Sequence, residues 1–230
     1  MSFIINVIIP AFNEEASIGK VISEIPDLVS EIIVVNNNSS DQTENVAKMT
    51  GATVLSEPQK GYGFACLKGL EYIASQEIKP DIVVFLDGDY SDYPQELHKI
   101  IAPIISNNID LAIGSRVKRW RQKGSMTFPQ IFGNWLATSL MKLFFDAKFT
   151  DLGPFRAIKY EKLLALQMQD KTYGWTVEMQ LKAVKQKLSY IEVPVHYKNR
   201  IGTSKVSGTV KGAIFAGVKI LSWIFKYSFK

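Results

Sequence analysis

Two carboxylates separated by a single glycine, Asp87 and Asp89, follow the apolar run Ile82–Leu86. Carboxylates with this spacing at the end of a strand can hold Mg²⁺ or Mn²⁺, with the oxygens of a diphosphate completing the coordination shell. The small Gly88 between them lets a diphosphate approach the backbone. Because the same three residues also occur in ordinary acidic turns, their surroundings decide between the two interpretations.

Two further polar loops, Pro10–Glu15 and Asn36–Thr43, also follow apolar runs. In an open parallel sheet, ligands bind outside the carboxyl ends of the strands, where such loops leave the sheet together. We therefore expect both loops to converge with Asp87–Asp92 on one crevice. This placement favours a metal and diphosphate site at Asp87 and Asp89.

Short apolar runs alternate with amphipathic segments along most of the chain, which predicts an α/β fold with a mostly parallel, Rossmann-like sheet covered by helices on both faces. The expected strands are Phe3–Pro10, Glu31–Val35, Ala52–Ser56, Ile82–Leu86, Asp110–Gly114 and Tyr190–Val195. The expected helices are Ala16–Ile25, Asp41–Met49, Phe64–Ser75, Pro94–Ile105, Gln130–Phe145, Tyr160–Leu166 and Val177–Gln186. The basic stretch Lys118–Ser125 is interpreted as a loop, and Lys60–Gly63, which lacks the spacing of a P-loop, mainly as a close-packed turn.

The composition indicates one globular domain with a substantial core, since 47% of the 230 residues are hydrophobic. The formal net charge of +5 is compatible with nucleic acid, anionic lipid or a phosphorylated ligand, but the acidic strand ends argue against nucleic acid. Cys66 is the only cysteine, which excludes an intramolecular disulfide and fits the cytoplasm. Asn6 and Pro10 interrupt the first apolar stretch, which is therefore interpreted as a strand and not as a signal peptide.

Five motifs follow one another along the chain: Pro10–Glu15, Val34–Thr43, Asp87–Asp89, Gly114–Arg116 and Arg200–Lys205. Together they resemble the motifs of family 2 glycosyltransferases, in particular of the dolichyl-phosphate mannose or glucose synthase-like branch. The resemblance extends over residues 4–208, nearly the whole chain. It implies an A-type glycosyltransferase fold, an inverting mechanism and a divalent metal, either Mg²⁺ or Mn²⁺.

The resemblance also implies roles for individual residues. The residues it places around the nucleotide and the metal are Pro10, Ala11, Phe12, Glu14, Asp87, Gly88 and Asp89. The residues it places at the diphosphate or at an acceptor phosphate are Arg116, Arg200, Ser204 and Lys205. Without these motifs, the basic side chains would be interpreted as a solvated surface and Phe12 as core packing.

The chain departs from the family pattern at Asn36 and Asn37, where similar enzymes carry two aspartates. A carboxylate can accept both N–H groups of a guanine edge, whereas an amide offers one acceptor and two donors. Asn37 could accept from the ring N–H of uracil and donate to a carbonyl oxygen, which favours a UDP-sugar over a GDP-sugar. The alternative is that Asn36–Asn38 only form a turn.

The acceptor decides whether the reaction needs a general base. A lipid phosphate is already anionic at neutral pH, whereas a hydroxyl must lose a proton during the attack. Asp151 and Glu178 are the candidate bases, and either could instead orient an arginine such as Arg156, which is the role we favour. The departing diphosphate requires positive charge, so Arg116 and the metal ligand Asp89 complete the expected catalytic set.

The segment Lys211–Phe229 is strongly apolar, but Lys219 and Lys226 interrupt it, so its apolar stretches are shorter than the roughly 18 to 20 residues that span a bilayer. On a helical wheel, its lysines and Ser222 lie within about 80° of one another, broken only by Phe215. This pattern predicts an amphipathic interfacial helix with a basic face. The alternative is a helix that docks on the domain or on a second subunit. We therefore expect a catalytic domain at residues 1–208 and a separate helix at 209–230.

Three functional hypotheses follow from these features. The first is transfer of a hexose from a nucleotide sugar to a polyprenyl or dolichyl phosphate by a protein that is peripheral at the cytoplasmic face of a membrane. The second is transfer to a hydroxyl of a glycan or small molecule. The third is a non-catalytic nucleotide-sugar-binding subunit, which the amides at Asn36 and Asn37 prompt and the retained Asp87 and Asp89 oppose. The sequence is compatible with a homo-oligomer and with a membrane-anchoring partner.

Overall fold

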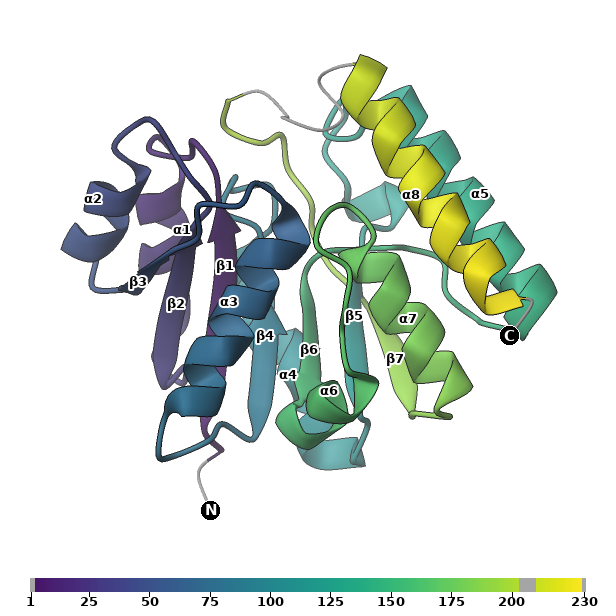
Figure 1. The fold of residues 1–230 in the computed structure, drawn as a ribbon, viewed down its shortest axis with the longest axis horizontal. Helices are drawn as coiled ribbons and strands as arrows, with labels where there is room; N and C mark the ends of the chain where they lie inside the picture. Colours follow the sequence, from purple (N-terminus) through teal and green to yellow (C-terminus); the bar gives the residue numbers. More distant parts are fainter. Residues whose placement is uncertain (1–2, 203–209, 229–230) are drawn as a thin grey trace.

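The computed structural model describes residues 3–202 and 210–228, and within them lies one seven-stranded sheet in the order β3-β2-β1-β4-β6-β5-β7 (Figure 1). The strands are β1 (Ile5–Ala11), β2 (Glu31–Asn36), β3 (Thr53–Ser56), β4 (Ile82–Phe85), β5 (Leu111–Ser115), β6 (Arg156–Lys159) and β7 (Tyr190–Pro194). Neighbouring strands are parallel except β6, which is antiparallel to both β4 and β5. The expected mostly parallel sheet is thus confirmed, whereas β6 is a strand that the sequence pattern did not predict.

Helices connect the strands and cover both faces of the sheet (Figure 1). They are α1 (Ile18–Ser23), α2 (Thr43–Met49), α3 (Tyr62–Ser75), α4 (Leu97–Asn107), α5 (Phe128–Phe145), α6 (Tyr160–Leu166), α7 (Trp175–Lys185) and α8 (Val210–Ser228). The helix expected from Pro94 begins as a 3₁₀ turn, Pro94–Glu96, before α4. The expected loop at Lys118–Ser125 contains a second 3₁₀ turn, Lys118–Trp120.

The core has two layers because alternate residues of a strand point to opposite faces. In β1, Val7 and Ile9 belong to one buried cluster and Ile8 to the other. Cys66 on α3 is fully buried in the cluster that contains Ile8, as expected for a cysteine that serves packing. The α/β fold with helices on both faces is therefore confirmed.

The C-terminal helix α8 lies beside α5 and also packs on α7 (Figure 1). Trp223 and Ile224 are buried in the contact, whereas Phe215, Val218 and Phe225 are exposed. Lys219, expected on a solvent-facing basic side, instead pairs with the buried Asp170. The helix therefore docks on the domain, while Ser222 and Lys226 of the predicted basic face stay exposed beside Phe215, Val218 and Phe225.

Candidate functional site

The loops after β1, β2 and β4 meet around a cavity of about 310 Å³, as the positions of the strand ends predict. The wall of this first cavity contains the predicted nucleotide-site residues Pro10, Ala11, Phe12, Glu14, Asn37, Asp87, Gly88 and Asp89, together with Arg200. Lys60 and Tyr62, from the stretch interpreted mainly as a close-packed turn, also line it, as do Thr172 and Tyr173, which no sequence motif marked. Phe12 is not core packing, because its half-buried ring lies in this wall with the Lys60 ammonium 5.2 Å from the ring centroid.

The half-buried Asp87 and the buried Asp89 bring two acids to the wall of the cavity. Asp87 Oδ1 has no hydrogen-bond partner among the residues that the structure describes. Burial, followed by the charge of Asp89, raises the pKa of Asp87 to about 7. The nearby Asp92 is also buried, and burial together with the charges of Asp87 and Asp89 raises its pKa well above the ordinary value. A nearby positive charge would stabilise the ionised form of these neighbouring carboxyl groups.

The two carboxylates fit a divalent cation, because oxygen ligands suit Mg²⁺ and Mn²⁺ and the orphaned Asp87 Oδ1 is free to coordinate one. Within residues 3–202 and 210–228, no cluster of three or more His, Cys, Asp or Glu side chains could hold a metal ion. Asp87 and Asp89 alone therefore offer only part of a coordination shell, which the oxygens of a bound diphosphate would complete.

Arg200 brings a positive charge into direct contact with Asp89. Its Nη1 lies 3.0 Å from Asp89 Oδ2, and its Nη2 donates to Glu14 Oε1 at 2.8 Å. The residue after it is also held, because the Ile201 N–H donates to the Asp89 carbonyl at 3.0 Å. Arg200 thus lies beside the acids of the predicted metal and diphosphate site, whereas Ser204 and Lys205 lie outside the described residues.

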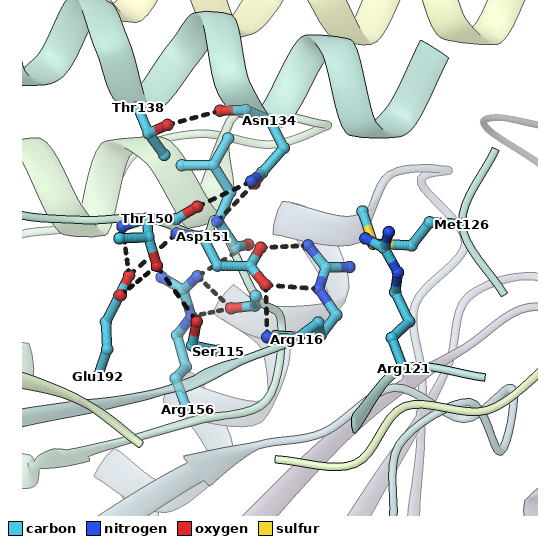
Figure 2. A network of polar contacts seen from close by, with 12 residues as sticks. Ser115, Arg116, Arg121, Met126, Asn134, Thr138, Thr150, Asp151, Arg156 and Glu192 are labelled. Atoms are coloured by element: carbon cyan, nitrogen blue, oxygen red, sulfur yellow. Dashed lines mark hydrogen bonds and ion pairs between the residues drawn. The ribbon is translucent and has the colours of Figure 1, made fainter. Parts of the chain in front are cut away.

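Arg116, at the end of β5, forms a two-pronged ion pair with Asp151 (Figure 2). Its Nε donates to Asp151 Oδ2 at 2.9 Å and its Nη2 to Oδ1 at 2.5 Å, while the Arg116 backbone N–H also donates to Oδ2 at 2.7 Å. Asp151 therefore orients an arginine, as favoured, but the arginine is Arg116 and not Arg156. Arg156 is fully buried and donates to the carbonyls of Leu152, Gly153 and Thr176.

Glu178, the second candidate base, does not line the cavity that contains Asp87 and Asp89. It is fully buried in α7, where it pairs with Lys182 at 2.7 Å. Its carboxylate also accepts the backbone N–H groups of Gln169 and Asp170. The structure thus gives Glu178 the role of holding the start of the loop before α7.

The amide of Asn37 is engaged by the protein itself. Its Nδ2 donates to the carbonyls of Glu57 at 3.1 Å and Gln59 at 2.7 Å, and its Oδ1 accepts the Gly61 N–H at 2.8 Å. Both amide hydrogens are therefore used, so the expected donation to a uracil carbonyl is wrong. Only the second lone pair of Oδ1 is left for a base.

A second cavity of about 340 Å³ adjoins the first, because Tyr62, Asp87, Asp89, Tyr173 and Arg200 line both. Its remaining wall comes largely from Arg116, the Leu152–Pro154 region, α5 and α8. No sequence motif marked α5 and α8 as part of the site, because their contribution depends on how the two helices pack. Asp87 and Asp89 thus lie where two chambers meet.

Paired carboxylates and arginines beside two adjoining cavities, at the carboxyl ends of a mostly parallel sheet, are the arrangement expected of the A-type glycosyltransferase fold. Residues 6–165 match the model of the family "Glycosyl transferase family 2", and the chain belongs to this family.

Similar proteins indicate which branch of the family the chain resembles, and one solved structure has the same fold. An uncharacterized glycosyltransferase of Mycobacterium tuberculosis is 31% identical over 215 residues, 92% of this chain and 94% of the relative. The UDP-N-acetylglucosamine–dolichyl-phosphate N-acetylglucosaminyltransferase of Methanococcus voltae is 28% identical over 84% of each chain. The crystal structure of M. tuberculosis glucosyl-3-phosphoglycerate synthase with Mn²⁺, UDP and phosphoglyceric acid has the same fold, with a TM-score of 0.78 at 22% identity over 98% of this chain and 78% of that one. The predicted resemblance to the polyprenyl-phosphate branch is confirmed.

Proposed function

We propose that the protein transfers a hexose from a UDP-sugar, with inversion and with a divalent metal, to a polyprenyl phosphate at the cytoplasmic face of a membrane. The observation that carries this proposal is the junction of the two cavities at Asp87, Asp89 and Arg200. A donor in the first cavity and an acceptor in the second would meet at this junction, where charge develops on the departing diphosphate.

The preference for uracil rests on the single acceptor that Asn37 still offers. Uracil presents one ring N–H, which the remaining lone pair of Oδ1 can accept, whereas guanine presents a ring N–H and an amino group side by side. The Methanococcus voltae relative is named for a UDP-sugar donor and a dolichyl-phosphate acceptor, which supports the same assignment.

Asp87 and Asp89 would hold Mg²⁺ or Mn²⁺, which would supply positive charge to the departing diphosphate. Arg200 and Arg116 add to this positive charge, and Asp151 fixes the direction of the Arg116 guanidinium. Both carboxylates that the sequence offered as candidate bases are engaged, Asp151 with Arg116 and Glu178 with Lys182. An acceptor that is already anionic suits this arrangement better than a hydroxyl does.

The membrane assignment rests on the outer side of the two helices that wall the second cavity. The exposed apolar residues of this side, here called the α5–α8 face, are Phe128, Ile131, Phe132, Trp135, Leu143, Phe144, Phe215, Val218 and Phe225. Neither helix contains an acidic residue, and Lys142 and Lys226 are exposed on them. Exposed aromatic groups beside lysines suit the interface of an anionic bilayer. No described helix is long and apolar enough to cross a membrane.

The proposal is tested by incubating the purified protein with Mn²⁺, a panel of UDP- and GDP-hexoses and short polyprenyl phosphates, followed by analysis of the lipid products. We expect a lipid-linked hexose of inverted anomeric configuration with a UDP-sugar, and loss of product when EDTA replaces Mn²⁺. A protein with Asp89→Ala is the control for contaminating enzymes. Product only with hydroxyl acceptors, or only with GDP-sugars, would contradict the proposal.

A further inference from the structure

The loop Asp170–Gly174, which joins α6 to α7, is folded around one buried carboxylate. Asp170 is 1% exposed, and its Oδ1 accepts the backbone N–H groups of Thr172 at 2.7 Å and Gly174 at 2.9 Å. The Asp170 N–H in turn donates to Glu178 Oε2 at 2.7 Å. Because each bond has a charged partner, the loop has one strongly favoured shape.

This loop forms part of the wall around the predicted nucleotide. Thr172 and Tyr173 line the first cavity, and Tyr173 also lines the second. The loop carbonyls of Lys171 and Thr172 accept N–H groups from Phe64 at 3.0 Å and Gly63 at 3.2 Å, in the first turn of α3.

Two glycines make this approach possible. A Cβ on Gly63 would lie 2.0 Å from the Asp170 carbonyl oxygen, and one on Gly61 would lie 2.2 Å from that of Lys171. Gly61 also donates its N–H to Asn37. A displacement of the loop would therefore move the start of α3 and the base-binding wall with it.

The other oxygen of the same carboxylate holds α8. Trp223 Nε1 donates to Asp170 Oδ2 at 2.6 Å, and Lys219 Nζ lies 3.2 Å from that oxygen. The indole also packs on the loop backbone, because a Cβ on Gly174 would lie 2.4 Å from Trp223 Cδ1. In Figure 1, α8 lies beside α5 at one end of the sheet, and the loop reaches from α7 toward the start of α3.

We propose that Asp170 and Trp223 are positioning residues through which the seating of α8 on the domain sets the nucleotide-binding wall. Coupling between two sites is reciprocal in free energy, so bound nucleotide must stabilise the seated helix by as much as the seated helix tightens nucleotide binding. The identity of the nucleotide rests on the proposed function. Because α8 carries part of the α5–α8 face, binding of this face to a lipid surface would change the seating of α8. Through Asp170 and Trp223 it would thereby change the affinity for the donor.

Two substitutions separate this coupling from simple packing. Trp223→Phe keeps an aromatic ring but removes the N–H donor. Asp170→Asn keeps an oxygen for the Thr172 and Gly174 N–H groups but turns an amide donor toward the indole N–H. We expect each variant to bind UDP with Mn²⁺ about fivefold or more weakly in calorimetry, and to show faster hydrogen exchange in the loop and in α8. Trp120→Phe, in the 3₁₀ turn Lys118–Trp120 and outside the walls of both cavities, is the matched control and should change neither quantity.

The double variant and the kinetics sharpen the test. If the two residues act through one contact, the double variant binds UDP no more weakly than the weaker single variant. The loss should appear in KM for the donor, with kcat at saturating donor nearly unchanged. Unchanged UDP affinity in both single variants, or additive losses in the double variant, would overturn the proposal. If the wild-type protein binds no UDP, the proposed function fails, and unchanged exchange in the loop of Trp223→Phe without nucleotide then overturns the coupling independently.

Discussion

Arg200 and Asp89 lie 3.0 Å apart, measured from guanidinium Nη1 to carboxylate Oδ2, and the same guanidinium reaches Glu14 at 2.8 Å. Glu14 follows β1 and Asp89 follows β4, so one side chain connects the ends of two strands. A cation bound between Asp87 and Asp89 would compete with Arg200 for the Asp89 carboxylate. Such a cation would leave the Arg200 guanidinium available to the diphosphate.

Arg200→Lys tests this bridging role. Lysine keeps the charge but lacks the planar fork that contacts Glu14 and Asp89 together. We expect kcat/KM to fall about 10- to 100-fold, the equivalent of one hydrogen bond to a charged group. Steady-state kinetics with varied UDP-sugar measures the loss. Arg121→Lys, whose guanidinium contacts Met126 Sδ, serves as the control, and equal losses in both variants would argue against a specific role for Arg200.

The raised pKa of Asp87 predicts a pH-dependent metal affinity. Because its pKa of about 7 in the folded protein exceeds the ordinary value of 3.8, folding disfavours the ionised form. Asp87 therefore lowers the stability of the metal-free protein increasingly as the pH rises from about 4 to about 7. A bound cation removes that cost by replacing the proton.

We expect the apparent Mn²⁺ affinity to rise about tenfold per pH unit below pH 7 and to level off above it. Calorimetry between pH 5.5 and 8 measures this slope, and the heat in buffers of different ionisation enthalpy measures the released proton. Asp87→Asn should remove the dependence together with most of the affinity. An affinity of the wild-type protein that does not vary over this range would contradict the assignment.

Asp151→Asn distinguishes an orienting residue from a general base. Breaking a buried ion pair leaves Arg116 without its counter-charge, so we expect the free energy of unfolding to fall by about 3 kcal/mol. The rate should fall by the same factor at every pH from 6 to 9, because no proton transfer is lost. A loss that shrinks as the pH rises would instead indicate that Asp151 accepts a proton. The exposed Asp146→Asn is the control for denaturation and kinetics.

Asn37→Asp tests the corrected role of the amide. A carboxylate has no hydrogen to donate to the carbonyls of Glu57 and Gln59, so it would be repelled by both. We expect the free energy of unfolding to fall by about 1–3 kcal/mol and UDP binding to weaken without any gain in GDP affinity. Titration of the variant with both nucleotides measures this, and tighter binding of GDP would restore Asn37 as the residue that selects the base directly.

Charged substitutions on the α5–α8 face test its contact with lipid. Phe128 and Trp135 are 78% and 59% exposed, so replacing either with aspartate should leave the fold unchanged. Losing the burial of one large aromatic side chain should weaken binding to anionic vesicles about tenfold or more, as measured by flotation. The matched control is Met49→Asp on α2, a residue 88% exposed and outside this face. Equal binding of all variants would contradict the assignment.

The sequence predicted the parallel part of the sheet well, because β1, β2 and β4 are apolar runs whose polar loops must meet at one edge. It did not predict β6, whose four residues, Arg156–Lys159, begin and end with a basic side chain. These basic residues satisfy their charges through distant partners, Arg156 through backbone carbonyls and Lys159 through Asp110. Such partners belong to the tertiary structure and leave no local pattern.

The residues of the candidate site, like the strands, were predictable from the sequence only in part. Asp87, Asp89 and Glu14 were predictable because their loops follow strands directly. The engagement of Asn37 was not, because it depends on the carbonyls of Glu57 and Gln59, about 20 residues further along the chain. Tyr173 and the helices of the second cavity were also missed, since only packing brings them to the site. The close spacing of Gly61 and Gly63 was the one local signal of the contact between α3 and the loop before α7.

The ion pair of Arg116 with Asp151 closes a segment that starts at the end of β5 and returns at the beginning of β6. These two strands are antiparallel neighbours, so the segment leaves and re-enters the sheet at the same edge, and it contains the whole of α5. Residues 117–150 thus form one insertion between two adjacent strands, and this single insertion brings α5 to the wall of the second cavity.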